Sequence, residues 1–213
     1  MENKVRRTQE ERSASMRQRL LDATIDCLVT YGYAGTTTSK VAELAGVTRG
    51  AQVHHFPTKA DLVTAAVRHL AIKRAEFAHT QLDRLRAADD MVGAALDLLW
   101  EAHQGPIFTA TVELWVASRS DEELREQVST MESLAASSFA EFDRDVFPEF
   151  PGHPRVRHFF YTAMDTMRGI LLNGFVLTDD EVIDQRWRRA RAHLRTLAQG
   201  ILDELTAEQS SSR

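Results

Sequence analysis

Hydrophobic positions recur every three or four residues along most of the chain, which is the period of an amphipathic helix. The first stripe, within residues 15–31, is followed by a stop at Gly32 and consists of Leu21, Thr24, Ile25, Leu28 and Tyr31. No alternating run bounded by hairpin-turn residues is found. The pattern therefore predicts an all-α protein with about nine helices.

Glycine, proline and capping residues divide these helices. In the front part, Thr37 and Thr58 are good N-caps, and the predicted helices cover 15–31, 38–45, 48–56 and a long segment from Lys59. Breaks at Gly105-Pro106 and at 148–154 separate the later helices, which are expected at 90–103, 107–118, 121–147, 155–175 and 180–205. The two short helices around Gly46 form a helix-turn-helix pattern.

This organisation predicts four parts. A flexible basic arm (1–14) precedes a helix-turn-helix domain (15–60, with the motif at about 38–57). A helical-bundle body (61–206) and a frayed tail (207–213) follow. Lys4, Arg6, Arg7 and Arg12 give the arm its charge, which suits the DNA backbone or a minor groove but equally a solubilising tail.

Charge is distributed unevenly in the 213 residues, whose net charge is −5. The first 60 residues hold nine basic and six acidic residues, whereas the rest hold 17 and 25. A basic front on an acidic body is typical of a nucleic-acid-binding head on a regulatory domain. The lone Cys27 makes no internal disulfide, and neither a secretory signal nor a run of membrane-spanning length is found, so a cytoplasmic protein is expected.

Residues 20–63 closely resemble the N-terminal domain of the TetR family of bacterial transcriptional regulators. The matching positions are Gly32-Tyr33, Thr36-Thr37, Val41-Ala42, Ala45-Gly46-Val47, Gly50-Ala51, His54-His55-Phe56 and Lys59. The resemblance implies a dimeric DNA-binding regulator that recognises a short inverted repeat. It also implies that the helical body (61–206) binds a small-molecule effector and dimerises. Repression is the usual mode in the family, although activation stays open.

The second short helix is expected to enter the major groove with its N-terminal residues nearest the bases. Arg49 can pair with guanine, and Gln52, on the same face, with adenine. Small Gly50 and Ala51 allow close approach, and Thr48 lies beside them. Thr37, Thr38 and Lys59 begin helices, where a phosphate is favoured, although Thr37 also suits a simple cap and Lys59 a solvated position.

Two positions depart from the family pattern, in which an apolar residue and Tyr precede the His pair. Here Gln52 and Val53 stand in their place, and we expect Val53 with Phe56 to anchor the helix while Gln52 faces DNA. His54 and His55 are adjacent, so they point about 100° apart and are poorly placed to share a metal ion. One is expected at a phosphate and the other packed inward, with no metal or cofactor.

For an effector pocket the sequence offers only residue types, aromatic, flexible and occasionally charged. The candidates are Trp100, His103, Phe108, Glu113, Trp115, Met131, Phe139, Met164, Met167 and Arg168. Plain core packing is the alternative for each of them. Glu113 and Arg168 sit in apolar stretches and need partners, either each other or the polar end of an effector.

The resemblance also implies dimerisation through the C-terminal domain, and we expect the last two helices to form the interface. A twofold dimer would place two recognition helices about 34 Å apart. The candidate interface residues are Phe159, Phe160, Met164, Trp187, Leu194, Leu197 and Ile201. The same stripes also contain Met167, Ile170, Leu171, Ala190 and Leu205. Core packing within one protomer is the competing interpretation.

The sequence leaves two other classes of protein to consider, an enzyme and a protein-interaction module. An enzyme is not indicated, since neither a nucleophile elbow, a phosphate-binding loop, a dinucleotide fingerprint nor a zinc-protease motif is found, and Cys27 lies among apolar neighbours. A helical protein-interaction module stays open; it predicts no salt-dependent duplex affinity. In the regulator, an effector would shift the dimer between two geometries through the helix that begins at Lys59.

Overall fold

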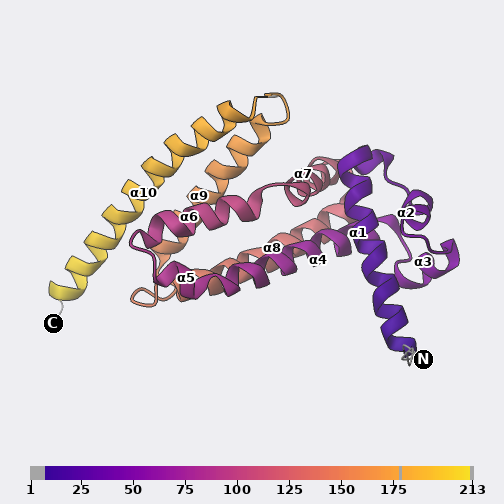
Figure 1. The fold of residues 1–213 in the computed structure, drawn as a ribbon, viewed down its shortest axis with the longest axis horizontal. Helices are drawn as coiled ribbons and strands as arrows, with labels where there is room; N and C mark the ends of the chain where they lie inside the picture. Colours follow the sequence, from indigo (N-terminus) through magenta and orange to yellow (C-terminus); the bar gives the residue numbers. More distant parts are fainter. Residues whose placement is uncertain (1–7, 178, 212–213) are drawn as a thin grey trace, which may run out of the picture. The chain divides into compact units, whose positions relative to one another are not determined.

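The computed structural model describes residues 8–177 and 179–211, and these residues form ten helical segments and no strand (Figure 1). The helices are α1 (Gln9–Gly35), α2 (Thr38–Leu44), α3 (Arg49–His55), α4 (Lys59–Thr80), α5 (Leu82–Arg86), α6 (Met91–His103), α7 (Pro106–Ser118), α8 (Glu122–Val146), α9 (Pro154–Asn173) and α10 (Asp180–Ser211). The all-α prediction is confirmed. The additional helix is α5, whose five residues are too short to show a periodic pattern.

The chain divides into two compact units. The first contains the chain up to Lys73 together with Gly105–Leu134, and the second contains Arg74–Gln104 together with the chain from Ala135 onwards. These two units are not divided at residue 60, and the boundary of the predicted DNA-binding domain stays a prediction. Long helices α4 and α8 each contribute to both units, and α7 joins the first unit because it packs against α1.

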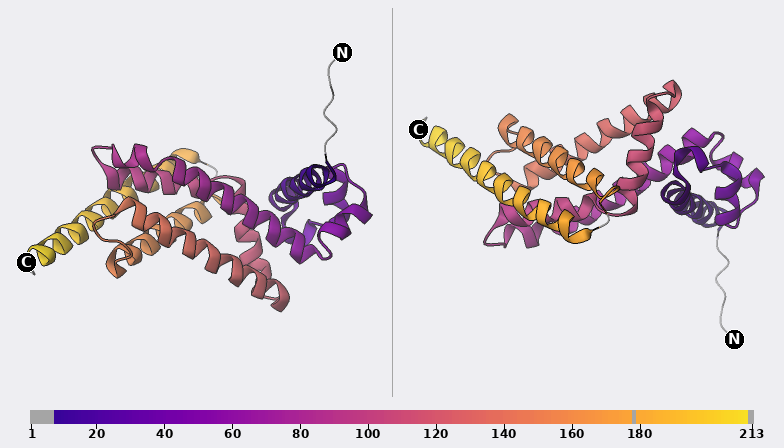
Figure 2. Two further views of the ribbon diagram at one scale, coloured as in Figure 1. Left: turned by 90° about the horizontal axis from the view of Figure 1, so that it is seen from below. Right: turned by 90° about the horizontal axis from the view of Figure 1, so that it is seen from above.

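The first unit is built around the apolar face of α1. Leu20 and Leu28 are fully buried there, and they share a core with Val41 of α2, Leu62 of α4 and Leu114 of α7. Burying a leucine side chain completely contributes about 1.5–3 kcal/mol, so these contacts hold the short helix α2 on a larger scaffold. Phe56, directly after α3, belongs to the same core. The helices α1, α2 and α3 are seen together at the indigo end of the chain in Figures 1 and 2.

The start of α1 lies earlier than the sequence pattern indicated. Thr8 and Glu11 form a reciprocal capping box, in which each side chain accepts a hydrogen bond from the other residue's backbone N–H. Residues 9–14 are consequently helical, and the prediction of a flexible arm through residue 14 is wrong for them. Lys4, Arg6 and Arg7 lie outside the described residues.

The second unit is a helical bundle in which α6, α9 and α10 share one core. Neighbouring helices α9 and α10 run side by side in opposite directions (Figures 1 and 2). Trp100 of α6 stacks on Trp187 of α10, with ring centroids 4.5 Å apart and planes 4° from parallel. The last helix continues to Ser211, so the predicted fraying from residue 207 is wrong for residues 207–211.

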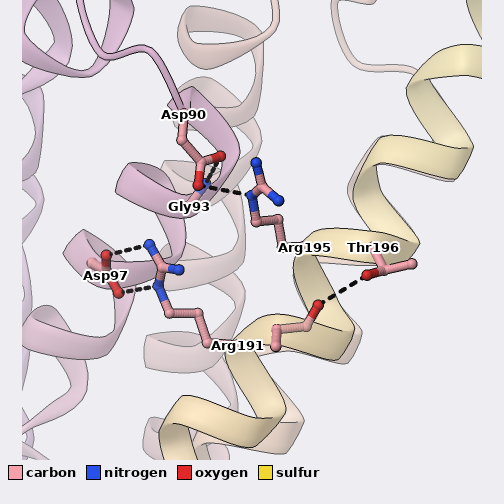
Figure 3. Close-up of polar contacts among 7 residues, drawn as sticks. Asp90, Gly93, Asp97, Arg191, Arg195 and Thr196 are labelled. Carbon is pink, nitrogen blue, oxygen red and sulfur yellow. Dashed lines mark hydrogen bonds and ion pairs between the residues drawn. The ribbon is translucent and has the colours of Figure 1, made fainter.

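Two aspartate–arginine pairs tie α6 to α10 (Figure 3). The guanidinium of Arg191 meets both carboxylate oxygens of Asp97, at 2.6 and 2.7 Å. Arg195 Nε donates to Asp90, which also caps α6 by accepting the Gly93 N–H. None of the described helices is long and apolar enough to cross a lipid bilayer.

Candidate nucleic-acid interface

Threonine side chains fix the beginnings of both short helices. Thr37 Oγ1 accepts the Lys40 N–H at the start of α2, and Thr48 Oγ1 accepts the Ala51 N–H at the start of α3, each at 3.2 Å. Gly46 turns the chain between the helices with φ 63°, a conformation that side chains disfavour. These local contacts form the predicted helix-turn-helix, and Thr37 acts as the cap that the sequence indicated.

One face of α3 is open to solvent. Its exposed residues are Arg49, Gly50, Val53 and His54, preceded by exposed Thr48, whereas Ala51 is half-buried. A Cβ added at Gly50 would meet nothing within 4 Å, so this face is free of neighbouring side chains at its N-terminal end. Arg49 is thus exposed on this face, and its contact with a base edge stays a prediction.

The predicted orientation of Gln52 and Val53 is wrong. Gln52 is 0% exposed, while Val53 is 46% exposed. Gln52 Nε2 donates to the carbonyl oxygen of Phe56 at 2.7 Å, which caps the end of α3, and its Oε1 has no hydrogen-bond partner. Because Gln52 and Phe56 are one helical turn apart, the hydrogen bond and the inward phase of Phe56 together hold the glutamine inside. Gln52 therefore lies inside the domain in this structure and is not on the exposed face of α3.

The two histidines end α3 in different environments. His54 is exposed and His55 is half-buried, and their rings meet edge to face with centroids 5.6 Å apart. This agrees with one ring turned outward and the other turned partly inward. Across the described residues, no group of three His, Cys, Asp or Glu side chains is arranged to hold a metal ion.

Lys59 at the start of α4 is turned towards Tyr33. Its Nζ donates to the Tyr33 carbonyl oxygen and lies 4.0 Å from the centroid of the Tyr33 ring. Burial lowers the pKa of Lys59 and raises that of Tyr33. Lys59 thus has an internal role that the sequence did not suggest, and a phosphate contact through it stays a prediction. Thr38 is half-buried beside the exposed cap Thr37.

Lys40, which the sequence did not single out, contacts the end of α1. Lys40 Nζ donates to the Gly35 carbonyl oxygen at the end of α1 and lies 4.4 Å from the centroid of the Tyr31 ring. Tyr31, expected on the buried stripe, is 53% exposed. A lysine in the first turn of a helix after a glycine stop is the only signal in the sequence for this contact.

A side chain of α7 also forms a hydrogen bond with the end of α1. The chain leaves helical geometry at Gly32, with φ 66° and ψ 177°, and the Tyr33 N–H donates to Glu113 Oε2 at 2.9 Å. The suggested pairing of Glu113 with Arg168 is therefore replaced by this backbone contact. Arg168 lies 4.0 Å from Asp165 on its own helix. Glu113 positions the helix-turn-helix scaffold.

The other pocket candidates have packing or hydrogen-bonding roles in one unit or the other. In the first unit Phe108 and Met131 are buried, and Trp115 Nε1 donates to Glu132 at 3.0 Å. Second-unit candidates Trp100, Met164 and Met167 are buried, and His103 Nδ1 lies 2.8 Å from the Leu99 carbonyl. Phe139 lies outside the residues whose side chains are described. The effector pocket stays a prediction.

Most of the predicted interface residues are core residues of a single protomer. Phe159, Phe160, Met164, Trp187 and Leu194 are all buried within one chain. They were misplaced because the inner and outer faces of a helix in a bundle both carry apolar residues. Leu197 is 47% exposed, and Ile201 is half-buried beside a small apolar hollow between α9 and α10. Exposed Tyr161 and Leu172 of α9 were not predicted.

Known proteins resemble both the sequence and the fold. Residues 20–66 match the family model for bacterial regulatory proteins of the tetR family. The HTH-type transcriptional regulator CymR of Pseudomonas putida is 37% identical over 123 residues, which cover 58% of this chain and 61% of CymR. A regulator of Mycobacterium bovis is 32% identical over 125 residues, 59% of this chain and 64% of the relative. The chain thus spans less than two thirds of the length of these relatives.

A solved member of the TetR family from Streptomyces coelicolor A3 superposes with a TM-score of 0.58 at 26% identity, over 85% of this chain and 97% of the other. The fold and the capped pair α2 and α3 define a helix-turn-helix protein. Its residues 20–66 match the model of the tetR family of bacterial regulatory proteins, in agreement with the resemblance seen in the sequence.

Proposed function

We propose that the chain is a sequence-specific DNA-binding transcriptional regulator that reads a short inverted repeat as a homodimer. The observation that carries this proposal is the solvent-exposed face of α3, with Arg49 at its start and Gly50 beside it. An arginine at the N-terminal end of such a helix can donate two hydrogen bonds to guanine in the major groove. The match of residues 20–66 to the tetR family supports the same function.

Dimerisation is supported by unpaired apolar surface on the last two helices. Tyr161 and Leu172 of α9 and Leu197 of α10 are 38–47% exposed in the single chain. Pairing these faces across a twofold axis would remove apolar side chains from water and present two copies of α3 to successive turns of the duplex. Sedimentation of the free protein should therefore give a dimer.

A small-molecule effector and a repressor mode complete the proposal. Both rest on the family resemblance, and the two units provide helices that an effector could bias between two geometries. An effector that binds tightly and leaves DNA affinity unchanged would contradict this part of the proposal.

Selection of binding sites from a random duplex pool tests the main proposal. A DNA-binding regulator should enrich an inverted repeat whose half-sites are about one helical turn apart, and its affinity should fall steeply with salt. A helical protein-interaction module would enrich no sequence. That result, obtained across a range of salt and with folded dimeric protein, would overturn the proposal.

A further inference from the structure

An apolar side chain stands in the middle of the open face of α3. Val53 is 46% exposed and lies between exposed Arg49 and exposed His54. Single exposed apolar residues are ordinary on protein surfaces and need no explanation by themselves. Val53 differs because its neighbour Gln52, the polar residue suited to a base edge, is fully buried. The helix therefore presents a methyl-bearing surface where a hydrogen-bonding one was expected.

The position of Val53 relative to Arg49 fits base recognition. The two residues are four apart on one helix, so they lie on the same face and about 6 Å apart along the helix axis. Successive base pairs are about 3.4 Å apart, so the two side chains would reach bases within about two steps of each other. Gly50, on the same face, adds no bulk that would hold this surface away from the duplex.

The chemistry of the surface selects the base. In the major groove thymine alone carries a methyl group, at C5, and apolar side chains recognise it by contact. Gln52 offers no competing hydrogen bond there, because its Nε2 donates to the Phe56 carbonyl inside the domain. A valine has two methyl groups and no polar atom, so cytosine, adenine and guanine gain nothing from it.

We propose that Val53 is a specificity-determining residue that contacts the 5-methyl group of a thymine, within about two base pairs of the guanine read by Arg49. This inference rests on the proposed function. It assigns one apolar and one hydrogen-bonding contact to each half-site. It also removes from the recognition code the adenine that Gln52 would have read.

Deoxyuridine tests the contact, because it differs from thymidine only by the missing methyl group. Duplexes based on the selected operator would carry deoxyuridine at one thymine position of both half-sites at a time, and affinity would be measured with the full chain. At one thymine position, the substitution is expected to lower the affinity about fourfold per half-site, which is the factor that corresponds to burial of one methyl group. Val53→Ala should bind the thymine duplex more weakly and show a smaller loss with deoxyuridine, because alanine keeps only part of the apolar surface of valine.

The matched control is Val116→Ala, which changes a 58% exposed valine on α7 and should keep the deoxyuridine effect. Alanine favours helix more than valine does, so loss of folding would not explain a change in Val53→Ala. Binding with no deoxyuridine-sensitive position, or with a sensitivity that is undiminished in Val53→Ala, overturns this inference alone. A wild-type chain that selects no duplex overturns the proposed function and this inference together.

Discussion

The carboxylate of Glu113, on α7, accepts a 2.9 Å hydrogen bond from the backbone N–H of Tyr33, which lies 80 residues earlier at the end of α1. Gly32 makes this approach possible, since a Cβ there would lie 2.8 Å from Glu113 Oε2. The Tyr33 carbonyl is taken up by Lys59. One residue at the end of α1 thus connects α1, α4 and α7 within the first unit.

Removing the carboxylate of Glu113 should destabilise the first unit. Glu113→Ala leaves the half-buried Tyr33 N–H without its acceptor, and a hydrogen bond to a charged group contributes about 1.5–3 kcal/mol when buried, less when partly solvated. We expect a loss of about 1–2 kcal/mol in the free energy of unfolding, measured with urea. Glu113→Gln retains an acceptor oxygen and should lose less. Equal stability of Glu113→Ala and wild type would show that the contact is dispensable.

Gln52 offers a second test, because its burial predicts that an apolar substitution changes the stability little and a charged one lowers it strongly. Gln52→Leu removes an unpartnered buried oxygen but also the bond to Phe56, so stability should change by less than about 1 kcal/mol. Gln52→Glu places a charge at a fully buried position and should cost more than about 3 kcal/mol at neutral pH. Affinity of Gln52→Leu for the selected duplex should remain within about twofold of wild type. A tenfold loss in a folded variant would restore the base-reading role.

The capping residues of this site could be predicted from the sequence, whereas the burial of Gln52 and the contact of Glu113 could not. Caps such as Thr37 and Thr48 and the glycine turns follow from local chemistry, so they were predictable. The phase of α3 was not, because adjacent residues 52 and 53 differ by about 100° and hydrophobicity alone favoured burying Val53. The Glu113 contact joins positions far apart in the sequence, and no local pattern indicates it.

Replacing Gly93 by alanine should destabilise the protein, although a change from glycine to alanine normally stabilises a helix. A Cβ at this position would lie 2.3 Å from Asp90 Oδ2 and 2.6 Å from Arg191 Nη2, so alanine would displace both aspartate–arginine pairs between α6 and α10. We expect Gly93→Ala to lose about 1–2 kcal/mol in thermal unfolding. Gly200→Ala, on α10 with nothing within 4 Å of the added Cβ, should gain up to about 1 kcal/mol. Equal gains at both sites would contradict the packing described.

The pair formed by Asp90 and Arg195 predicts a dependence of stability on pH. The hydrogen bond from Arg195 holds the pKa of Asp90 below its ordinary value. A depressed folded-state pKa contributes stability above the unfolded pKa of about 3.9, and this stability is lost as pH falls through the folded value. Arg195→Gln should therefore be less stable than wild type at pH 7. The two curves should begin to converge as pH falls below about 4, and a difference that stays constant to the lowest pH would argue against this origin.

The central claim is that the exposed face of α3 reads DNA through Arg49. The most direct measurement is the affinity of wild type and Arg49→Ala for the selected duplex and for a scrambled duplex, across a range of salt. The account predicts a steep fall of wild-type affinity with salt, and a loss in Arg49→Ala of about 1–3 kcal/mol that is confined to the selected duplex. Equal affinity of the two proteins for the selected duplex, or wild-type binding that ignores salt and sequence, would contradict it.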